Sequence, residues 1–350
     1  MVTRLIPHVV FLLGGQGSQY FGMARSLYEK DARFRALQEE LDEIATLACG
    51  RSPLSYLHRS RIGGPCDDLE LTSLGLFMVE YGLAVRLRDH GLEPDIIVGA
   101  SLGEFISLAV SGMADPHMAL GFIARFTRAI PSVLPAGGMT AVLGSLEAVT
   151  AAVKSDEVSL ASVNSDQHVV LSGKSSALAD VSRRLAISGA ICCELPVRYP
   201  FHSSACDSLG ALMRRLVDGY SPGFSAADRV SVTGFSAADR VSVTGPETWS
   251  SSIAGPRTSF SGTAAWEAIA RPIRFSETIR ALPKYESNLY VDLTPSGSLA
   301  AALKSMRVVR AVHSIVTPFG RDPEMLSDVL REAKELGVLR GGRAEFDEED

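Results

Sequence analysis

The chain has 350 residues, of which 46% are hydrophobic and 21% are charged, and its formal net charge is −6. These values are typical of a globular protein with one large domain or two smaller ones. They argue against a membrane protein, because no apolar run approaches the roughly 20 residues of a membrane-spanning helix. The nearly balanced charge gives no indication of nucleic-acid binding.

The cysteines and the chain ends predict a cytoplasmic protein. The N-terminal residues show no signal-peptide pattern. The cysteines lack metal-binding spacing, so we expect reduced thiols, with no metal and no disulfide; they are Cys49, Cys66, Cys192, Cys193 and Cys206. Residues 341–350 carry five acidic residues and one arginine, which predicts a disordered, solvated tail.

The first elements in chain order are a strand, a glycine-rich loop and helices. Residues 9–13 (VVFLL) predict a buried strand, and residues 14–19 (GGQGSQ) predict a loop that opens a helix from about Tyr20. Apolar residues with helical spacing then predict a helix over 73–88, before a strand at 96–98. This alternation predicts a parallel sheet with helices on both faces.

A Gly-x-Ser-x-Gly motif follows that strand, from Gly99 to Gly103. Strand, tight turn and helix are the context of a nucleophile elbow, in which Ser101 would lie at the tip of the turn with its hydroxyl exposed. The two glycines would let the backbone turn sharply. The backbone N–H of Leu102 would lie at a helix N-terminus, where an oxyanion is stabilised. The alternative is a glycine-rich loop whose serine takes no part in chemistry.

The region from 137 to 199 has a different pattern. The order of its predicted elements, β-α-β-β-α-β, is typical of a ferredoxin-like unit. Strands are predicted at 139–143, 158–163, 168–172 and 190–197, helices at 146–153 and 177–187, and a hairpin turn at 164–166. We therefore predict a small ferredoxin-like α+β subdomain over 137–199, inserted into a large domain formed by 1–136 and 200–340.

One segment is repeated without a change, since residues 223–233 recur as residues 234–244. Two copies do not make a repeat protein. The pair lies in a polar stretch flanked by glycine and proline, so we predict a surface loop and assign it no function.

A serine nucleophile needs a base, and His202 stands out among the seven histidines. It ends the segment Tyr199-Pro200-Phe201-His202, directly after the last predicted strand of the small subdomain. A rigid Pro-Phe approach would bring the imidazole back onto the large domain. The other histidines lie in surface-like or subdomain contexts, where a structural role is the ordinary one. On the histidine alone, a structural role for His202 also stays open.

Together these motifs resemble the malonyl-CoA:acyl-carrier-protein transacylase family, which includes the acyltransferase domains of fatty acid and polyketide synthases. The resemblance covers roughly residues 8 to 320. It implies an α/β fold, with an α/β-hydrolase-like core that has a parallel sheet and the ferredoxin-like subdomain inserted. The matching segments are 15–19 (GQGSQ), 99–104 (GASLGE), the stretch after Asn164, 201–203 (FHS), 272–275 (PIRF) and 291–295 (VDLTP).

The resemblance implies a ping-pong acyl transfer. His202 would deprotonate Ser101, which would attack an acyl thioester, and a phosphopantetheine thiol of an acyl carrier protein, or water, would then take the acyl group. The N–H groups of Gln16 and Leu102 would form the oxyanion hole. A backbone carbonyl in the segment matched by Arg274 would orient the histidine. No metal and no bound cofactor are implied, because the substrates are CoA or phosphopantetheine thioesters.

Three departures from the family pattern bear on the substrate. Malonyl-loading members have an arginine about one helix beyond the serine, which pairs with the free carboxylate; that position falls on Phe126 here, with Arg125 beside it. The residue before the serine, usually histidine, is Ala100, and a glutamine common before the elbow is replaced around Ser73. If Phe126 lines the pocket, an uncharged acyl group is favoured, whereas a one-residue bulge would restore Arg125.

Three further residues complete the predicted substrate-binding set: Asn164, Tyr199 and Phe201. Phe201 precedes the histidine as in malonyl-type members, whereas methylmalonyl-type members usually have a serine there. This difference argues weakly against methylmalonyl.

Three functions remain open on the sequence. The first is an acyltransferase of polyketide or fatty acid biosynthesis that charges an acyl carrier protein. The second is a proofreading acyl hydrolase with the same serine and histidine, and the third is a non-catalytic scaffold that binds a carrier protein. Carrier proteins are acidic, so we expect a basic docking surface, with the candidates Arg198, Arg271, Arg274, Lys304, Arg307 and Arg310; scattered charges without a partner are the alternative. We expect a monomer, with no nucleic-acid or membrane partner.

Overall fold

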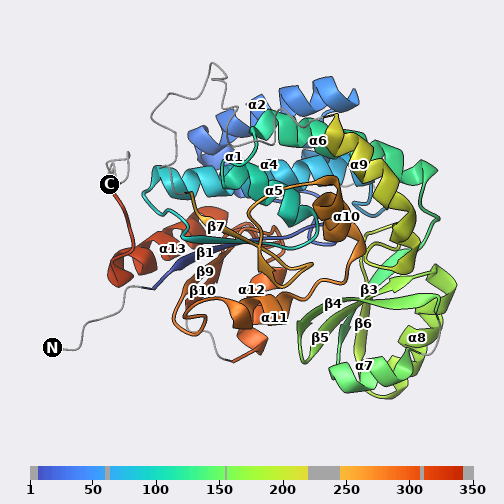
Figure 1. The fold of residues 1–350 in the computed structure, drawn as a ribbon. Helices are drawn as coiled ribbons and strands as arrows, with labels where there is room; N and C mark the ends of the chain where they lie inside the picture. Colours follow the sequence, from blue (N-terminus) through green and yellow to red (C-terminus); the bar gives the residue numbers. More distant parts are fainter. Residues whose placement is uncertain (1–6, 60–63, 154–155, 220–244, 308–310, 342–350) are drawn as a thin grey trace.

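A six-stranded sheet lies at the centre of the larger part of the molecule (Figure 1). The computed structural model describes residues 7–59, 64–153, 156–219, 245–307 and 311–341. The strand order is β10-β9-β1-β2-β7-β8. All neighbours in this order run parallel except the short edge strand β8, which is antiparallel to β7. The strands are β1 Val9–Leu13, β2 Ile96–Gly99, β7 Glu247–Ser250, β8 Gly255–Pro256, β9 Leu289–Asp292 and β10 Ala311–Ser314.

Some sequence predictions fall on other parts of the chain. The repeated segments 223–233 and 234–244, Arg310, and residues 342–350 of the predicted tail lie outside the described residues.

The two faces of the sheet bury alternate side chains of the same strand. On β1, Phe11 and Leu13 pack with helices α4, α5 and α6, whereas Val10 and Leu12 pack with α11 and α12 on the opposite face. Alternate residues of a strand point to opposite faces, so a strand covered on both sides must be apolar throughout. The predicted layered α/β fold is therefore confirmed. These helices are α4 Leu69–Asp89, α5 Leu102–Val110, α6 Pro116–Ala129, α11 Phe275–Ala281 and α12 Ser298–Ser305.

The other described helices surround these layers, with α2 packed on α4 and α6, and α10 packed on α9. Their bounds are α1 Arg25–Lys30, α2 Ala32–Cys49, α3 Pro53–His58, α9 Gly210–Asp218, α10 Gly262–Ala270 and α13 Asp322–Leu336, with short 3₁₀ helices at Ile130–Ser132 and Ser204–Leu209. None of the helices in the described part of the chain has the length and apolar character needed to cross a membrane.

The first helix begins later than the sequence predicted. We expected it from about Tyr20, but α1 begins at Arg25. Gly22 and Ala24 have φ angles of 83° and 57°. A left-handed backbone cannot continue a right-handed α-helix, so the chain turns before α1 starts.

A separate antiparallel sheet has the predicted β-α-β-β-α-β order (green in Figure 1). Its strand order is β4-β5-β3-β6, and helices α7 and α8 cover one face through their own apolar cluster. The elements are β3 Gly138–Leu143, α7 Leu146–Ala152, β4 Val158–Ser165, β5 His168–Gly173, α8 Ser175–Ile187 and β6 Ile191–Glu194. One detail of the prediction is wrong: Asn164 lies in β4 and not in a turn, because the β4–β5 connection is a tight one of two residues.

The segment before α11 connects the two sheets. Ile273 forms a parallel bridge with Ser162 of β4. The backbone N–H of Ile273 donates to the Ala161 carbonyl over 2.8 Å, and its own carbonyl accepts from the Val163 N–H over 2.9 Å. The large part of the molecule thus adds a short extended piece to the edge of the small sheet, which fixes the small sheet beside the larger one.

Candidate active site

Ser101 occupies the turn between β2 and α5 in a strained backbone conformation. Its φ and ψ angles are 57° and −122°, a combination that residues with a side chain rarely adopt. The N–H of Ala100 donates to the Leu13 carbonyl over 2.9 Å, and the N–H of Glu104 donates to the Ser101 carbonyl over 2.9 Å. The strand, turn and helix that the sequence predicted around Ser101 are therefore present.

The two glycines of the motif permit close packing and do not form the sharp turn themselves. Positive φ falls on Ser101 and on neither glycine, contrary to the expectation. A Cβ atom on Gly103 would lie 2.2 Å from the Leu13 carbonyl oxygen, and one on Gly99 would lie 2.7 Å from the Glu104 Cα. Glycine is needed at both positions because backbone from a neighbouring segment occupies the space of a side chain.

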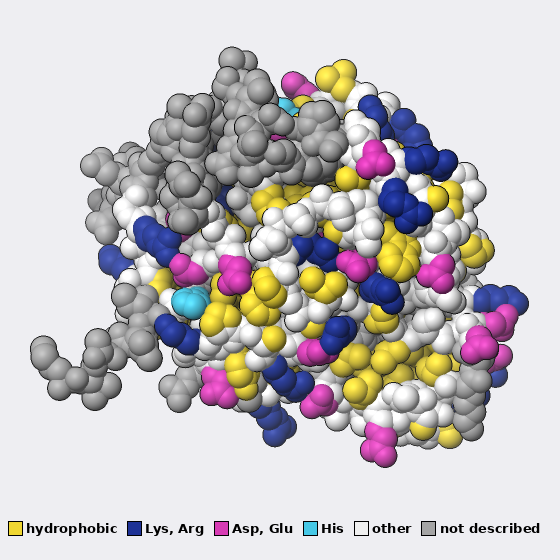
Figure 2. All heavy atoms as spheres, viewed as in Figure 1, with side chains coloured by type: hydrophobic (Ala, Val, Ile, Leu, Met, Phe, Trp, Pro, Cys, Tyr) yellow, Lys and Arg dark blue, Asp and Glu magenta, His cyan; other side chains and the backbone are white. Residues whose placement is uncertain are grey.

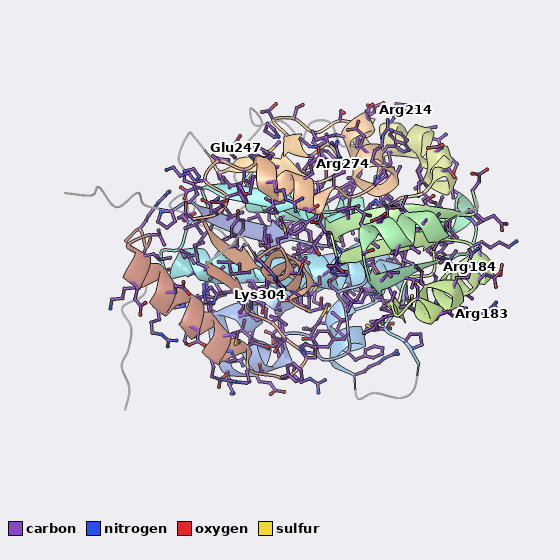
Figure 3. The ribbon with its side chains drawn as sticks, turned by 90° about the horizontal axis from the view of Figure 1, so that it is seen from below. Arg183, Arg184, Arg214, Glu247, Arg274 and Lys304 are labelled. Carbon is purple, nitrogen blue, oxygen red and sulfur yellow. The ribbon has the colours of Figure 1, made fainter. Side chains whose placement is uncertain are left out.

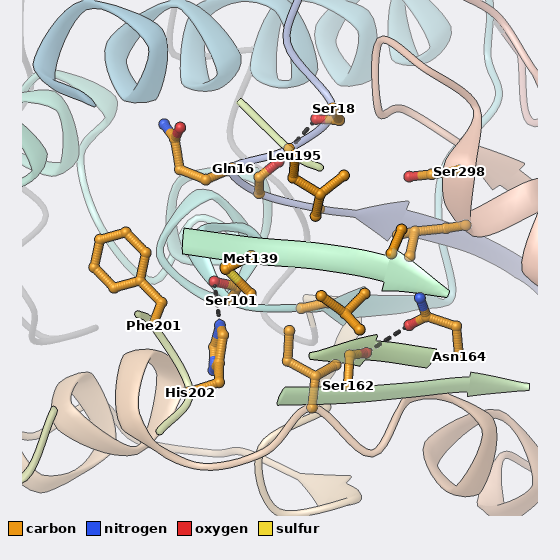
Figure 4. Close-up of a pocket in the computed structure, with 18 of the residues that line it drawn as sticks. Gln16, Ser18, Ser101, Met139, Ser162, Asn164, Leu195, Phe201, His202 and Ser298 are labelled. Carbon is orange, nitrogen blue, oxygen red and sulfur yellow. Dashed lines mark hydrogen bonds between the residues drawn. The ribbon is translucent and has the colours of Figure 1, made fainter. Parts of the chain in front are cut away.

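His202 lies beside Ser101 although 100 residues separate them in the chain, and Figure 4 shows the contact. Its Nε2 is 2.9 Å from the Ser101 Oγ, and its Nδ1 is 2.8 Å from the Arg271 carbonyl oxygen. Because a carbonyl only accepts, Nδ1 carries the proton and donates. Nε2 is then the unprotonated nitrogen, which accepts a hydrogen bond from the Ser101 hydroxyl.

The surroundings of His202 keep its imidazole neutral. The side chain is 2% exposed. Burial lowers its pKa to about 4, and the hydrogen bond to the Arg271 carbonyl opposes this only in part. The residue also has a positive φ of 59°, and its backbone N–H donates to the Ile269 carbonyl over 2.9 Å. A neutral, fixed imidazole can accept a proton from Ser101 at any pH well above 4.

The residue predicted to orient the histidine needs a correction. The accepting carbonyl belongs to Arg271, the residue directly after α10, and not to Arg274. The Arg274 side chain instead pairs with Glu277 on the first turn of α11, and its N–H donates to the Ser251 carbonyl. Carbonyl groups at the end of a helix lack partners within the helix, so the Arg271 carbonyl is available to His202. The backbone N–H of Arg274 instead connects the 272–275 segment to the large sheet.

The loop that follows β1 packs directly against the elbow. A Cβ atom on Gly15 would lie 3.0 Å from the Leu102 backbone nitrogen and 3.2 Å from the Ser101 Cβ. Leu102 is the first residue of α5, where backbone N–H groups lack partners within the helix. The Gln16 side chain turns toward α4 and donates to Thr72 and Ser73 over 3.0 and 2.7 Å. The predicted oxyanion residues Gln16 and Leu102 thus lie on two segments in contact beside Ser101.

A cavity of about 120 Å³ opens beside Ser101 and His202 (Figure 4). An apolar cavity of about 150 Å³ accommodates benzene, so this volume suits a short acyl chain. Its lining side chains include no lysine, arginine, aspartate or glutamate. Among the described residues, no group of three or more histidine, cysteine or acidic side chains is arranged to hold a metal ion. The lining comprises residues 14–18, Ala100, Ser101, Met139, Ala141, Ser162, Asn164, His168, Val170, Leu195, Phe201, His202, Ile273, Ser298 and Leu299.

The two residues predicted to contact the acyl group through α6 lie outside this cavity. Arg125 is exposed, and Phe126 is buried in an aromatic cluster with ring centroids 5.2 Å from Phe105 and 5.8 Å from Phe122. Phe122 and Phe126 are four residues apart and share one helix face, and that face packs against α5. The hypothesis that Phe126 lines the acyl pocket is therefore wrong for this cavity, and so is the one-residue shift that would bring in Arg125.

The other predicted substrate-binding residues divide in the same way. Asn164 and Phe201 line the cavity, whereas Tyr199 does not. Tyr199 packs beside Phe201 with ring centroids 6.0 Å apart. In Asn164, the side-chain oxygen accepts a hydrogen bond from the Ser162 hydroxyl over 2.6 Å, which leaves the amide N–H groups directed elsewhere.

Sequence reasoning missed a buried ionic network behind the elbow. The Glu104 carboxylate accepts from the Ser250 hydroxyl over 2.7 Å and lies 3.5 Å from the Arg257 guanidinium. Arg257 also contacts Glu267 of α10 over 3.2 Å. Burial raises the pKa of Glu104 to about 7. The network ties α5, which follows Ser101, to α10, which ends directly before Arg271. The only signal in the sequence was an acid beside the serine motif.

The fold and site define a class of protein: an α/β protein with a serine–histidine pair at a strand–turn–helix elbow, faced by a second, antiparallel sheet. The model of the acyl transferase domain family matches residues 10–338, and the chain belongs to this family. The resemblance proposed from the sequence is therefore confirmed.

Relatives and solved structures agree with this assignment. The polyketide biosynthesis acyltransferase homolog BaeD of Bacillus velezensis is 30% identical over 331 residues, covering 92% of this chain and 95% of that protein. The homolog PksD of Bacillus subtilis is 30% identical over 327 residues, with the same coverage of 92% and 95%. The chain is thus a member of the acyl transferase domain family, and these two relatives are named as acyltransferase homologs of polyketide biosynthesis.

Two solved structures show the same fold at low identity. The loading acyltransferase of the avermectin modular polyketide synthase matches with a TM-score of 0.78 at 21% identity, over 93% of this chain and 99% of that chain. A malonyl CoA-acyl carrier protein transacylase from Clostridium perfringens matches with a TM-score of 0.70 at 20% identity, over 95% and 99%.

Proposed function

We propose that the protein transfers an acyl group between thioesters in polyketide biosynthesis, through an ester on Ser101. The observation that carries the proposal is the 2.9 Å contact between the Ser101 hydroxyl and a His202 imidazole whose other nitrogen is held by a backbone carbonyl. This is the geometry of an activated nucleophile whose base is oriented by a third group. The acyl donor is a CoA or carrier-protein thioester, and the acceptor is the phosphopantetheine thiol of an acyl carrier protein.

In the first half-reaction Ser101 Oγ attacks the thioester carbonyl carbon while His202 Nε2 takes the hydroxyl proton. The negative charge on the carbonyl oxygen is stabilised by the backbone N–H groups of Leu102 and Gln16. The C–S bond then breaks, and His202 gives its proton to the departing sulfur. The products are a free thiol and an acyl-serine ester.

The second half-reaction runs the same steps in reverse. A carrier-protein thiol gives its proton to His202 Nε2 and its sulfur attacks the ester carbonyl, and the proton returns to Ser101 Oγ as the C–O bond breaks. No metal or bound cofactor enters either half-reaction, because the buried neutral histidine moves the proton.

The acyl group is uncharged. A malonyl carboxylate in the described cavity would find no lysine or arginine among the lining side chains. Moving an unpaired carboxylate out of water costs several kcal/mol, and each 1.4 kcal/mol is about tenfold in rate or affinity. We expect acetyl and other short uncharged acyl thioesters to acylate Ser101 about 100-fold faster than malonyl thioesters.

Hydrolysis is the second candidate function. The unprotonated Nε2 of His202 can also take a proton from water, so the same pair of residues would release free acids where water reaches the acyl-serine. Measurement of the products distinguishes transfer to a carrier-protein thiol from transfer to water.

Three of the proposed docking residues have a partner within the chain. Among the proposed docking residues, Arg198 pairs with Asp67, Arg274 pairs with Glu277, and Arg271 lies over the Trp266 ring. Lys304 and Arg307 are exposed on and after α12, and Figure 3 shows Arg274 and Lys304 well apart. Figure 2 shows basic and acidic side chains interspersed on one face of the molecule. Among the described docking candidates, a carrier protein would therefore meet positive side chains at separate positions.

Intact-mass spectrometry tests the proposal. The purified protein is mixed with acetyl-CoA, malonyl-CoA and an acyl carrier protein charged with a short acyl group. We expect an acyl adduct that is absent in Ser101→Ala. A matched control is Ser107→Ala, which removes a buried hydroxyl from α5, the helix that begins directly after Ser101.

The fate of the adduct separates the remaining functions. Appearance of the acyl group on an uncharged carrier protein supports transfer, and release of the free acid at the same rate with and without carrier supports hydrolysis. Failure to form an adduct or to turn over any thioester would contradict both and leave a scaffold that only binds carrier proteins.

A further inference from the structure

Helix α4 holds the loop beside Ser101 at two places. The Gly14 N–H donates to Glu80 Oε2 over 2.9 Å, and the Gln16 side chain donates to Ser73 Oγ over 2.7 Å. Ser73 and Glu80 are seven residues apart, which places both on one face of the helix. Gly15, between the two contacts, is the residue that lies against the Leu102 nitrogen.

Glu80 is an unusual residue for this position. Its side chain is completely buried, and Oε2 accepts from Gly14 while Oε1 has no hydrogen-bond partner among the described residues. A buried carboxyl group without full hydrogen bonding lowers stability compared with an apolar side chain of similar size. The buried residues of the helix within one turn of Glu80 are mostly apolar, among them Leu76, Phe77 and Leu83, so a leucine would fit the local pattern. The carboxyl group therefore needs a reason other than core packing.

The burial of Glu80 and the charge beside it indicate whether its carboxyl group is protonated. The charged group that faces it is Asp292 at the end of β9, which accepts N–H bonds from Thr294 over 2.9 Å and from Ala300 over 2.7 Å. Burial raises the pKa of Glu80 well above its usual value; the hydrogen bond from the Gly14 N–H opposes this in part, and the negative charge of Asp292 raises the pKa further. Burial raises the pKa of Asp292 to about 6. Two buried carboxyl groups do not both ionise readily, so Glu80 is the neutral acid of the pair.

The space around Gly14 leaves the loop little freedom. A Cβ atom on Gly14 would lie 2.4 Å from the Thr294 Cγ2, so the turn that follows β9 blocks movement on that side. The bond from the Gly14 N–H to Glu80 limits movement on the other side. A displacement of about 1 Å at a reacting group can cost roughly 100-fold in rate, so the position of this loop matters to the Gln16 N–H.

We propose that Glu80 is a positioning residue: by accepting from the Gly14 N–H, it sets the Gly15–Gln16 peptide against the elbow and thereby places the N–H that stabilises the oxyanion. This inference rests on the proposed function, since it concerns the rate at which Ser101 is acylated. Glu80 touches neither Ser101 nor His202 by any described contact, and it acts through the loop.

The test compares variants of Glu80 that differ in the acceptor. Glu80→Gln keeps an oxygen for the Gly14 N–H and is neutral, so kcat for acylation stays within about threefold of the unchanged protein. Glu80→Leu removes the acceptor, and Glu80→Asp withdraws it by one methylene. For both we expect kcat to fall about 10- to 100-fold with KM unchanged, because the lost interaction acts in the transition state.

Gln38→Leu is the matched control. Gln38 is also buried, and its side chain donates to the Met78 carbonyl of α4 over 2.8 Å, away from the loop. This variant removes one buried hydrogen bond to the same helix, so a lower melting temperature with unchanged kcat is expected. Glu80→Asp keeps the proposal testable if Glu80→Leu fails to fold.

The outcomes distinguish this inference from the proposed function. Equal kcat in Glu80→Asp, Glu80→Leu and the unchanged protein, with only the melting temperature lowered, would overturn the positioning role and leave acyl transfer intact. A loss of kcat in Glu80→Gln as large as that in Glu80→Leu would also overturn it, because the acceptor is retained. An unchanged protein that forms no acyl-serine would remove the proposed function and this inference with it.

Discussion

The large and small sheets face the same cavity, but they contribute different kinds of residue. From the large part come Ser101 and His202, both in strained positive-φ conformations and both fixed by backbone hydrogen bonds. From the small sheet come wall residues such as Met139 and Asn164, in ordinary strand conformation. Strain is kept where chemistry requires a fixed geometry. We therefore expect substitutions of Ser101 and His202 to change the rate, and substitutions of wall residues on the small sheet to change which acyl group is accepted.

The largest effect is expected on the large side, at the histidine. His202→Ala removes the group that we propose takes the serine proton, and the acylation rate is expected to fall at least about 1,000-fold. Stopped-flow or quenched-flow measurement of acyl-enzyme formation gives the rate. The control is His117→Ala, because His117 has no described contact with Ser101. A fall of less than about tenfold in His202→Ala would remove the residue from the mechanism.

A smaller loss is expected from the loop beside the elbow. In Gly15→Ala the new Cβ would lie 3.0 Å from the Leu102 nitrogen, so the loop must shift by a few tenths of an ångström. We expect the acylation rate to fall about 10- to 100-fold. Gly138→Ala is the matched control, because its nearest neighbour to a new Cβ is 3.6 Å away. Equal rates in the two variants would show that the oxyanion site tolerates this shift.

The pH dependence tests the burial of His202. Its pKa is lowered to about 4, so the neutral base is present from about pH 5 upward. We expect kcat/KM to rise through pH 4 and to be level across pH 6.5, where an exposed histidine would titrate. Between pH 4 and pH 6.5, His202 binds fewer protons in the folded state than in the unfolded state. Its contribution to the free energy of unfolding is therefore lost as the pH falls from 6.5 toward 4. An acid limb centred near 6.5 would contradict the buried, neutral histidine.

The small sheet should give selectivity with little change in rate. Ala141→Leu adds side-chain volume to the cavity wall. We expect kcat/KM for a longer acyl thioester to fall about tenfold, with less than about a threefold change for acetyl, because one or two methylene groups are worth 1–3 kcal/mol in an apolar pocket. Leu143→Ala, at a half-exposed position on the same strand, is the control. Equal losses for both substrates would argue against a wall that selects by size.

The smallest effect on selectivity is expected at Phe126. Because its ring packs with Phe105 and Phe122, Phe126→Ala should lower the free energy of unfolding by about 3–5 kcal/mol and leave the ratio of acetyl to malonyl acylation within about twofold. Denaturant unfolding and paired acylation rates give the two values. A change in the acyl ratio without a change in stability would return Phe126 to the acyl pocket.

Much of the fold could be predicted because its determinants are local. Apolar runs and helical spacing predicted β1, β2 and α4, and the strand-turn-helix context predicted the elbow at Ser101. His202 was found from its place after the small sheet and from a resemblance, not from any local pattern. The first and last residues of an element could not be predicted where a single φ angle decides them, as at Ala24 before α1.

The rest of the site could not be predicted, for physical reasons. The carbonyl that holds His202 belongs to the backbone of Arg271, and backbone groups leave no mark on residue type. Glu80 lies in the mostly apolar middle of α4, where an isolated acid is most simply interpreted as solvent-facing. Phe126 was placed by counting along a helix, but a rotation of 100° per residue decides between a pocket and a core, and only packing against α5 fixes that rotation.

We propose that Ser101 and His202 act on uncharged acyl groups, because no lysine or arginine is among the side chains that line the cavity. The most direct measurement is a competition in which the protein meets equal amounts of acetyl and malonyl thioesters, followed by rapid quenching and mass analysis of the peptide that contains Ser101. We expect acetyl-Ser101 to exceed malonyl-Ser101 about 100-fold. Equal labelling, or an excess of malonyl-Ser101, would contradict it.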